Sequence, residues 1–336
     1  DFCLSRGLGD VYKRQEQLWD AAGRAQLATP LAWQRYRDAG EFWDAWDLAA
    51  DYRDHPLSWA WAGVPELVEQ GPLCARFRWR GRCGSSAVRL DGRLLAGRPW
   101  LELTLAIHWR QRHELLRLEL PLAARASRWA ADTAGGVIER PAEAVTPRER
   151  ARWEVPAVSW LASVAAGGGE AGGLAVLLDG PQGVSATAER LGVSLLRAPT
   201  WPDPGADNGW QRQRLALMPY GGTWSAAGVP AEAIRLREPL WLRPAMAERT
   251  EATPPEGFAP LESGLVLIGC RPTASGPVLA VQNLSPRRRM VEPGPCWRLA
   301  VRLDGLDQPL QPQPAAVDLT RLGPWELGFW RLVSSG

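Results

Sequence analysis

The amino-acid sequence predicts an all-β protein in which antiparallel sheets pack on one another. Several short segments alternate apolar and polar residues, which is the period of a strand with one buried face. Three Asp-Gly pairs stand beside such segments, and Asp-Gly is typical of tight hairpin turns. The chain also contains 34 Gly and 29 Pro, a composition that divides it into many short extended pieces. Together these observations favour sheets packed on sheets.

The clearest alternation lies in residues 100–109, WLELTLAIHW. Its apolar positions are Leu101, Leu103, Leu105 and Ile107, and the residues between them are Glu102, Thr104, Ala106 and His108. Residues 115–122, LLRLELPL, repeat the pattern and place Leu116, Leu118 and Leu120 on one face. Because only the charged run RQRH and Glu114 separate the two segments, the sequence predicts that they form a hairpin with one solvent-exposed face.

Further turns are expected at Asp91-Gly92, Asp179-Gly180 and Asp304-Gly305. Six other segments have the composition and length of strands: 173–180, 192–199, 214–220, 264–270, 277–283 and 297–303. Helix is scarce. Residues 16–27 fit either a helix or a turn within a hairpin, and TPRERARW (146–153) fits a single helical turn.

Length and composition set the domain organisation and the class of protein. A chain of 336 residues suggests two domains, with a boundary in the polar, Pro-rich stretch 243–260 and a flexible surface loop at the Gly-rich 165–173. The net charge of +2 is spread along the chain, so neither nucleic acid nor a membrane surface is an expected partner. No apolar run approaches the roughly 18–20 residues of a membrane span.

The five cysteines favour a reducing compartment, and we therefore expect a cytoplasmic location. Their number is odd and their spacing irregular: Cys3, Cys74, Cys83, Cys270 and Cys296. Cys74 and Cys83 would face each other across a hairpin, but a reducing compartment argues against a disulfide between them.

The sequence contains few of the motifs that indicate a catalytic or metal site. The three histidines, His55, His108 and His113, are not expected to converge on a metal ion, which needs three or four ligands. The sequence contains neither a Gly-rich phosphate loop nor a G-x-S-x-G nucleophile motif. We therefore predict no catalytic residue, no metal site and no cofactor bound by this chain.

Two loops combine aromatic and carboxylate or amide side chains, in residues 42–54 and 201–211. Sugars stack on aromatic rings and bond to such polar groups, which makes these loops candidates for carbohydrate contact. Pro-Asp-Pro and Asp-Asn-Gly also form ordinary loops, and Trp also fills cores, so residue types alone favour a connector role. The candidate residues are Asp44, Trp46, Asp47, Asp203, Asp207, Asn208 and Gln211, with Trp43, Trp201 and Trp210 as aromatic neighbours.

Four segments in order resemble a known family: FWDAWDLAADYRDHPL (42–57), IERPAEAVTPRERARWEVPAVSW (138–160), VSLLRAPTWPDPGADNGWQRQRLALMPYGGTW (193–224) and AGVPAEAIRLREPL (227–240). They resemble the C-terminal half of the glycoside hydrolase family 38 α-mannosidases, and the tail from residue 309 is similar to that family's terminal strands. The chain departs from the family's pattern at Asn208, where some members have arginine, and at Tyr220, where histidine is usual. These departures argue against contact between the 201–211 loop and the substrate.

The resemblance implies a large antiparallel β-sandwich, a supersandwich of the galactose-mutarotase-like type, over residues 16–243. A linker (244–257) and a smaller C-terminal β-sandwich domain (258–333) would follow. Residues 1–15 contain Lys13, the only lysine in the chain, and we interpret them as a foreign run at the start of a truncated chain.

The resemblance further implies a parent enzyme that hydrolyses terminal α-mannosidic bonds with a zinc ion and a carboxylate nucleophile, both held by a catalytic domain ahead of these residues. The expected partners are that domain and the parent's oligosaccharide substrate, and loops 42–54 and 201–211 are the candidate docking face. An isolated β-rich half would expose this face and self-associate, which makes a homo-oligomer possible. The alternative is a free-standing carbohydrate-binding β-sandwich module.

Overall fold

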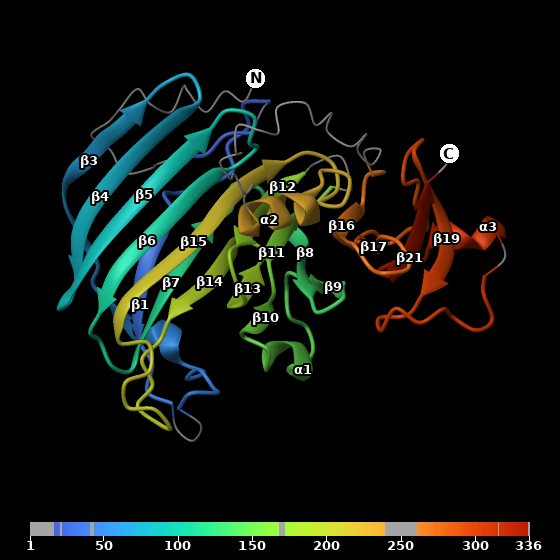
Figure 1. Cartoon of the computed structure of the whole chain (residues 1–336). Coiled ribbons are helices and arrows are strands. Elements are labelled where there is room, and N and C mark those ends of the chain that lie inside the picture. Colours follow the sequence, from blue (N-terminus) through green and yellow to red (C-terminus); the bar gives the residue numbers. More distant parts are fainter. Residues whose placement is uncertain are drawn as a thin grey trace. The chain divides into compact units, whose positions relative to one another are not determined.

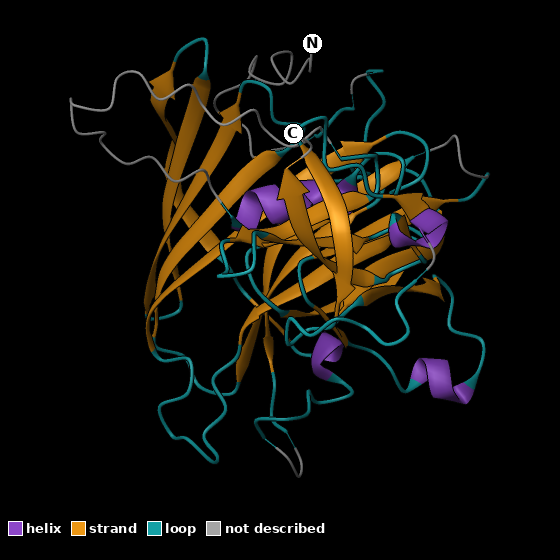
Figure 2. Cartoon of the chain, turned by 45° about the vertical axis from the view of Figure 1, so that its right-hand side comes forward, coloured by secondary structure: helices purple, strands orange, loops and turns teal. Residues whose placement is uncertain are grey.

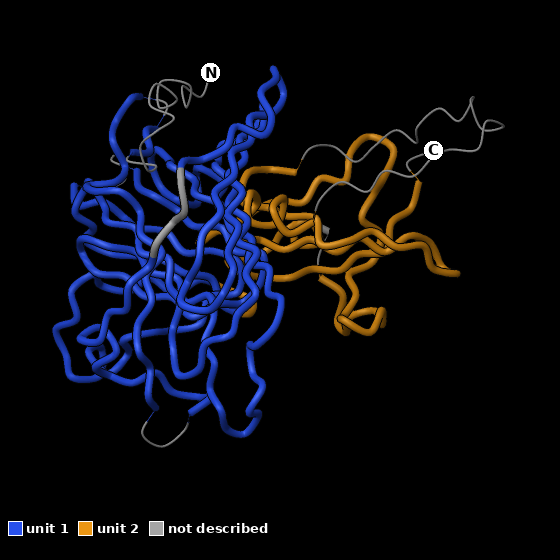
Figure 3. The backbone as a smooth tube through the Cα atoms, turned by 90° about the vertical axis from the view of Figure 1, so that its left-hand side faces the viewer, with its two compact units in different colours: residues 1–133, 137–229 blue, residues 134–136, 230–336 orange. Residues whose placement is uncertain are grey.

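A computed structural model describes residues 17–20, 22–40, 44–167, 172–238, 261–314 and 316–334. The chain divides into two compact units, with residues 1–133 and 137–229 in unit 1 and residues 134–136 and 230–336 in unit 2 (Figure 3). The expected foreign run (1–15) and the expected linker (244–257) lie outside the described residues.

Strands dominate both units, which confirms the all-β prediction (Figure 2). Within the described residues, unit 1 contains two sheets, of nine and six strands (Figure 1). The large sheet has the order β3 (Ala60–Gln70), β4 (Cys74–Cys83), β5 (Ser86–Leu95), β6 (Leu101–Trp109), β15 (Gly209–Tyr220), β12 (Gly173–Leu178), β11 (Trp160–Ala165), β8 (Ala126–Thr133) and β9 (Gly136–Pro141). The small sheet has the order β10 (Val155–Ala157), β13 (Gln182–Thr187), β14 (Arg190–Leu196), β7 (Glu114–Pro121), β1 (Ala32–Arg37) and β2 (Pro56–Leu57).

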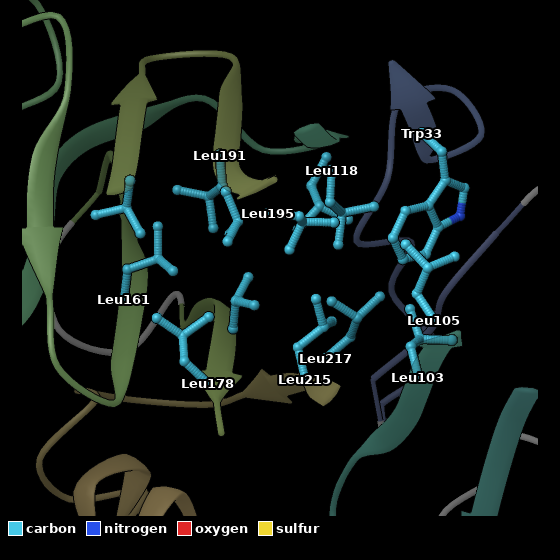
Figure 4. Close-up of a cluster of buried hydrophobic side chains, with 14 of the residues drawn as sticks. Trp33, Leu103, Leu105, Leu118, Leu161, Leu178, Leu191, Leu195, Leu215 and Leu217 are labelled. Carbon is cyan, nitrogen blue, oxygen red and sulfur yellow. The ribbon is translucent and has the colours of Figure 1, made fainter. Parts of the chain in front are cut away.

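The inner faces of the two sheets meet in one apolar core (Figure 4). The large sheet contributes residues such as Leu103, Leu105 and Leu215, and the small sheet contributes Leu118 and Leu191. Each fully buried leucine stabilises the fold by about 1.5–3 kcal/mol relative to an exposed one. The predicted alternation of residues 101–107 is confirmed, because their odd-numbered side chains all point into this core.

The predicted hairpin between residues 100–109 and 115–122 is wrong. Strand β6 pairs with β5 and β15 in the large sheet, whereas β7 pairs with β1 and β14 in the small sheet. Both segments bury their leucines in the same core from opposite sides, so residues 110–113 cross between the sheets. The prediction of a solvent-exposed face on β7 is also wrong. Leu115, Arg117 and Glu119, on the face away from the apolar core, are buried.

The Asp-Gly pairs have three different outcomes. Asp91-Gly92 does not turn but continues β5, because the Asp91 carboxylate accepts a hydrogen bond from Arg78 Nε on β4 at 2.6 Å. Asp179-Gly180 connects β12 to β13 in the other sheet, so it makes no hairpin. Asp304-Gly305 does begin a turn, which the Asp304 N–H closes by donating to the Gln308 carbonyl at 2.9 Å.

The described helices are short. Trp19 and Ala25 form an antiparallel bridge, so the described residues of the 16–27 stretch follow the turn alternative. The predicted helical turn is confirmed as α1 (Pro147–Arg150), with a capping box between Thr146 and Glu149. The other helices, which the sequence did not predict, are η2 (Tyr52–Asp54), α2 (Val229–Arg237) and α3 (Ala316–Leu319). Among the residues that the structure describes, no helix has the length and apolar character of a membrane span.

Unit 2 is a smaller β unit with its own core around Leu279, Val281 and Trp330. Its four-stranded sheet, as far as the structure describes the chain, has the order β16 (Leu265–Arg271), β17 (Val278–Asn283), β21 (Leu327–Ser334) and β19 (Trp297–Leu303). Strands β18 (Arg289–Met290) and β20 (Arg321–Leu322) pair beside it. Cys74 and Cys83 both belong to β4, at its two ends, and all four cysteines of the described residues are free thiols.

Close packing at Gly173 on β12 gives a test of this arrangement. A Cβ atom there would lie 2.2 Å from the Ser163 carbonyl oxygen on β11, an atom that cannot move without shifting the strand. Gly173→Ala should therefore lower the free energy of unfolding by about 1–3 kcal/mol, as measured by urea denaturation. Gly180→Ala is the matched control, because a Cβ there meets no atom within 4 Å. Equal stability of the two variants would contradict this packing.

Candidate functional site

The two aromatic–carboxylate loops lie side by side at one end of unit 1 (Figure 1). The Asp44 carboxylate in the first loop accepts hydrogen bonds from the backbone N–H groups of Thr200 at 2.6 Å and Trp201 at 3.2 Å. Arg197 adds a second link, because its guanidinium donates to the Asp47 carbonyl at 2.8 Å and pairs with Asp38. The structure thus joins segments about 150 residues apart in the sequence.

Three tryptophans of these loops are exposed. Trp46 is 63% exposed and Trp201 is 54% exposed, and their rings lie against each other with centroids 5.5 Å apart. Trp210 is 74% exposed and stacks on the His108 ring at 5.1 Å. Trp43 lies outside the described residues. Exposed aromatic rings of this kind are typical of binding surfaces rather than of a core.

Asp44 is the anchor of the paired loops. Burial alone would raise its pKa, but the Thr200 and Trp201 N–H groups and the nearby His113 ring together lower the pKa below its ordinary value. His113 Nδ1 lies 3.5 Å from the carboxylate, and the other ring nitrogen lies 3.2 Å from the Thr200 hydroxyl. The anionic form of Asp44 therefore stabilises this junction.

The other candidates divide into two groups. Asp207, Asn208 and Gln211 build the second loop: Asp207 accepts from the Arg197 N–H at 2.7 Å, Asn208 donates to the Gln111 carbonyl at 2.9 Å, and Gln211 donates to the Asp207 carbonyl at 3.1 Å. Burial raises the pKa of Asp207. Asp203 is exposed and caps its own turn by accepting from the Gly205 N–H at 2.8 Å.

Asp47 and Trp46 line a groove of about 600 Å³ on the outer face of the small sheet. The opposite wall is formed by Ala151 and residues 153–156, including the partly exposed Trp153 and Glu154, and β13 and β14 supply the floor. Trp153 and Glu154 are not among the site residues predicted from the sequence. Their aromatic–carboxylate pairing was a usable signal, but only the pairing of β10 with β13 brings them to the loops.

Beside the groove floor lies a fully buried arginine, Arg117 on β7. Its guanidinium donates to Glu119 at 2.9 Å, to the Ser194 hydroxyl at 2.7 Å and to the Ser185 hydroxyl at 2.7 Å. It also forms an ion pair with Glu154, whose other carboxylate oxygen accepts from the Ser194 hydroxyl at 2.7 Å. This set, Arg117 with Glu119, Glu154, Ser185 and Ser194, is the Arg117 network.

The strands leave room for this network by using glycine. A Cβ atom at Gly192 on β14 would lie 2.1 Å from an Arg117 nitrogen, and one at Gly183 on β13 would lie 2.7 Å from a Glu154 oxygen. Tyr52 covers the outer side, with the Arg117 guanidinium 5.6 Å from its ring centroid. The network thus fixes Glu154 at the groove wall and the 44–54 segment above the sheet.

Tyr220, where the family pattern has histidine, is an interior residue here. It is 4% exposed, and its hydroxyl donates to the Ser163 carbonyl at 2.5 Å. Burial raises the pKa of this phenol, so it remains a neutral hydrogen-bond donor. Tyrosine at this position therefore stabilises the packing of β15 near β11.

The described residues do not fit a zinc ion. Within them, no group of three or more His, Cys, Asp or Glu side chains comes together in a way that could hold a metal. Asp44 and His113 approach each other, but the other atoms near the Asp44 carboxylate are hydrogen-bond donors.

Comparisons with known proteins agree with the fold and the motifs. The model of the glycosyl hydrolases family 38 C-terminal domain matches residues 14–205. Alpha-mannosidase 2C1 of Homo sapiens is 31% identical over 270 residues, which are 76% of this chain and 25% of that protein. Alpha-mannosidase G of Dictyostelium discoideum is 29% identical over 223 residues, which are 62% of this chain and 19% of that protein.

A solved structure of a family 38 glycosyl hydrolase from Enterococcus faecalis shares the fold, with a TM-score of 0.67 at 13% identity. The match covers 93% of this chain and 41% of that one. An α-mannosidase structure from Enterococcus faecalis V583 gives a TM-score of 0.66 over 94% of this chain. The chain spans at most about a quarter of the length of the curated relatives that it matches.

The Asp44 anchor gives a pH-dependent prediction. Asp44→Asn should lower the free energy of unfolding of unit 1 by about 1–2 kcal/mol near neutral pH, because a charge-assisted bond to two N–H groups is weakened. The folded-state pKa lies below the ordinary 3.8, so this contribution is fully present above that value and is lost as the pH falls through the folded pKa.

Urea denaturation followed by tryptophan fluorescence should therefore show a constant difference between wild type and variant from about pH 7 to about pH 5, and a shrinking one towards about pH 3. Asp203→Asn is the control, since Asp203 is exposed and bonds only within its own turn. A difference that stays the same down to the lowest pH would exclude the ionised carboxylate as its source.

Proposed function

The chain belongs to family 38 of the glycosyl hydrolases, and from this premise we propose that it is the non-catalytic, β-rich C-terminal portion of an α-mannosidase. The observation that carries the proposal is the family match over residues 14–205, which includes the first aromatic–carboxylate loop, the start of the second (201–205) and both groove walls. The reaction of the whole protein would be hydrolysis of terminal α-mannosidic bonds.

The role proposed for this chain is to support the catalytic domain of the same protein. Trp46 and Trp201 form an exposed aromatic pair, and Asp47 and Asp203 provide a polar rim around it. An aromatic centre with a polar rim is the usual anatomy of a protein–protein interface. An interface between domains of one chain typically buries about 600–1,500 Å². We propose that these loops are the part of the chain that contacts the catalytic domain.

The zinc ion that the family resemblance implies would be held by that catalytic domain. None of the residues described here is proposed as its ligand. The contribution of this chain is structural: Asp44 fixes the paired loops, and the Arg117 network fixes the groove wall below them. A rigid platform holds the loops of a partner domain with little loss of entropy on docking.

A second candidate function is carbohydrate binding by the chain itself. The groove favours it, because Trp46 and Trp153 border a volume of about 600 Å³ together with Asp47 and Glu154. That volume lies within the range of small-molecule sites. Aromatic faces and carboxylates are the groups that stack on a sugar ring and accept bonds from its hydroxyls. This function requires no catalytic domain, which separates it from the first candidate.

A chimera tests the first candidate. This chain would replace the segment of human alpha-mannosidase 2C1 that it matches, and hydrolysis of an aryl α-mannoside would be measured for the chimera and for the chain alone. We expect hydrolysis by the chimera and none by the chain alone, with or without added zinc. Trp46→Ser combined with Trp201→Ser should reduce the yield of active chimera by about tenfold, because buried tryptophans dominate interface energies.

Leu73→Ser is the matched control, because Leu73 is 75% exposed and lies in the turn between β3 and β4 rather than in the loops. Loss of activity in the control equal to that in the tryptophan variant would contradict the docking role of the loops. Calorimetric titration of the chain alone with a mannose disaccharide addresses the second candidate. Binding that Trp153→Ser abolishes would favour the carbohydrate-binding module.

A further inference from the structure

Unit 2 contains a cavity of about 340 Å³ bordered by three arginines and one methionine. Arg288 and Arg289 come from the segment 285–290, and Arg321 comes from β20. The antiparallel pairing of β18 with β20 sets Met290 opposite Arg321, which brings the two segments together. No carboxylate of the described residues lines this cavity. The charged side chains that line it, among the described residues, are therefore all cationic.

A buried asparagine holds the arginine-bearing segment in shape. Asn283 is fully buried, and its amide nitrogen donates to the carbonyls of Arg287 and Gly323, both at 2.7 Å. Its amide oxygen accepts from the N–H of Ser285 at 3.0 Å and from the Ser285 hydroxyl at 2.7 Å. The backbone of the arginine segment is thus tied directly to the residues at the end of β20, so the backbone that carries Arg288 and Arg289 is fixed before any ligand arrives.

The charges around the cavity are only partly balanced. Arg289 pairs with Glu262 at 2.5 Å, and Arg321 pairs with Asp318 at 3.2 Å. Arg288 is exposed and has no carboxylate partner among the described residues. Three guanidinium groups around one small volume repel one another, and an anion between them would relieve that repulsion. The planar guanidinium fork matches phosphate and sulfate oxygens, because it donates two parallel bonds.

We propose that this cavity binds a phosphate or sulfate group, with Arg288, Arg289 and Arg321 as its ligands. The volume lies near the lower end of the range for small-molecule sites and accommodates either the free anion or a phosphorylated hexose. Arg288 supplies the charge that no described carboxylate neutralises. The Asn283 cluster supplies the rigid backbone, so the anion would not have to order the segment on binding.

Arginine-specific labelling of the full chain with phenylglyoxal tests the site directly. Inorganic phosphate should slow the labelling of Arg288, Arg289 and Arg321, as mapped by mass spectrometry, relative to chloride at the same ionic strength. Arg298 is the internal control, because it is an exposed arginine of β19 in the same unit. Equal protection of Arg298, or no protection of the three cavity arginines, would overturn the proposal.

Calorimetric titration with inorganic phosphate tests the role of the charge. Arg288→Gln should weaken binding by about tenfold or more, because a charge-assisted bond is lost, whereas Arg298→Gln should leave it unchanged. Arg288 is exposed, so its replacement leaves the fold intact, which thermal unfolding would verify. Titration with a hexose phosphate and with the unphosphorylated hexose separates the two sources of the anion. Phosphate binding that is identical in wild type and Arg288→Gln would refute the site.

Discussion

The outer face of the small sheet depends on one buried cation, the guanidinium of Arg117. A buried charge is unfavourable unless hydrogen bonds and opposite charges compensate for the hydration it has lost. Removing one partner of a buried pair therefore costs about 3–5 kcal/mol. Here two carboxylates and two hydroxyls occupy its donors. The partners come from β7, β13, β14 and the residue before β10, so one side chain specifies how four segments meet. The network also requires glycine at position 192, because any side chain there would overlap the Arg117 guanidinium.

The candidate site is built on this platform. Tyr52 covers Arg117, and the segment that carries Tyr52 also carries Asp44 and Trp46. The hydrogen bonds of Asp44 then hold the second loop, which presents Trp201 beside Trp46. Exposed aromatic rings are thus carried by loops whose own geometry is fixed by buried polar contacts. A surface of this kind can dock a partner without first becoming ordered, which is the property that a supporting domain of a larger enzyme needs.

Much of the fold could be predicted from local patterns, and the failures have a common cause. The alternation of residues 101–107 identifies a strand because each leucine faces the same core. On β7 the same alternation misleads, because a polar residue such as Arg117 can face either water or a buried polar network, and the sequence does not distinguish the two. Asp91-Gly92 has turn chemistry, yet the ion pair with Arg78 across the sheet keeps β5 extended. The paired loops were identifiable from composition, but the groove wall at Glu154 depends on β10–β13 pairing, which no local pattern encodes.

Arg117 organises the face that carries the paired loops and the groove. Hydrogen–deuterium exchange of Arg117→Met, compared with wild type, tests it most directly, and Arg76→Met on the exposed face of the large sheet is the control. Loss of the Arg117 guanidinium should speed exchange in residues 44–54, 151–156, 182–187 and 194–201, leave β5 unchanged, and have no counterpart in the control. Exchange that is unaltered in those segments, or raised equally throughout unit 1, would contradict it.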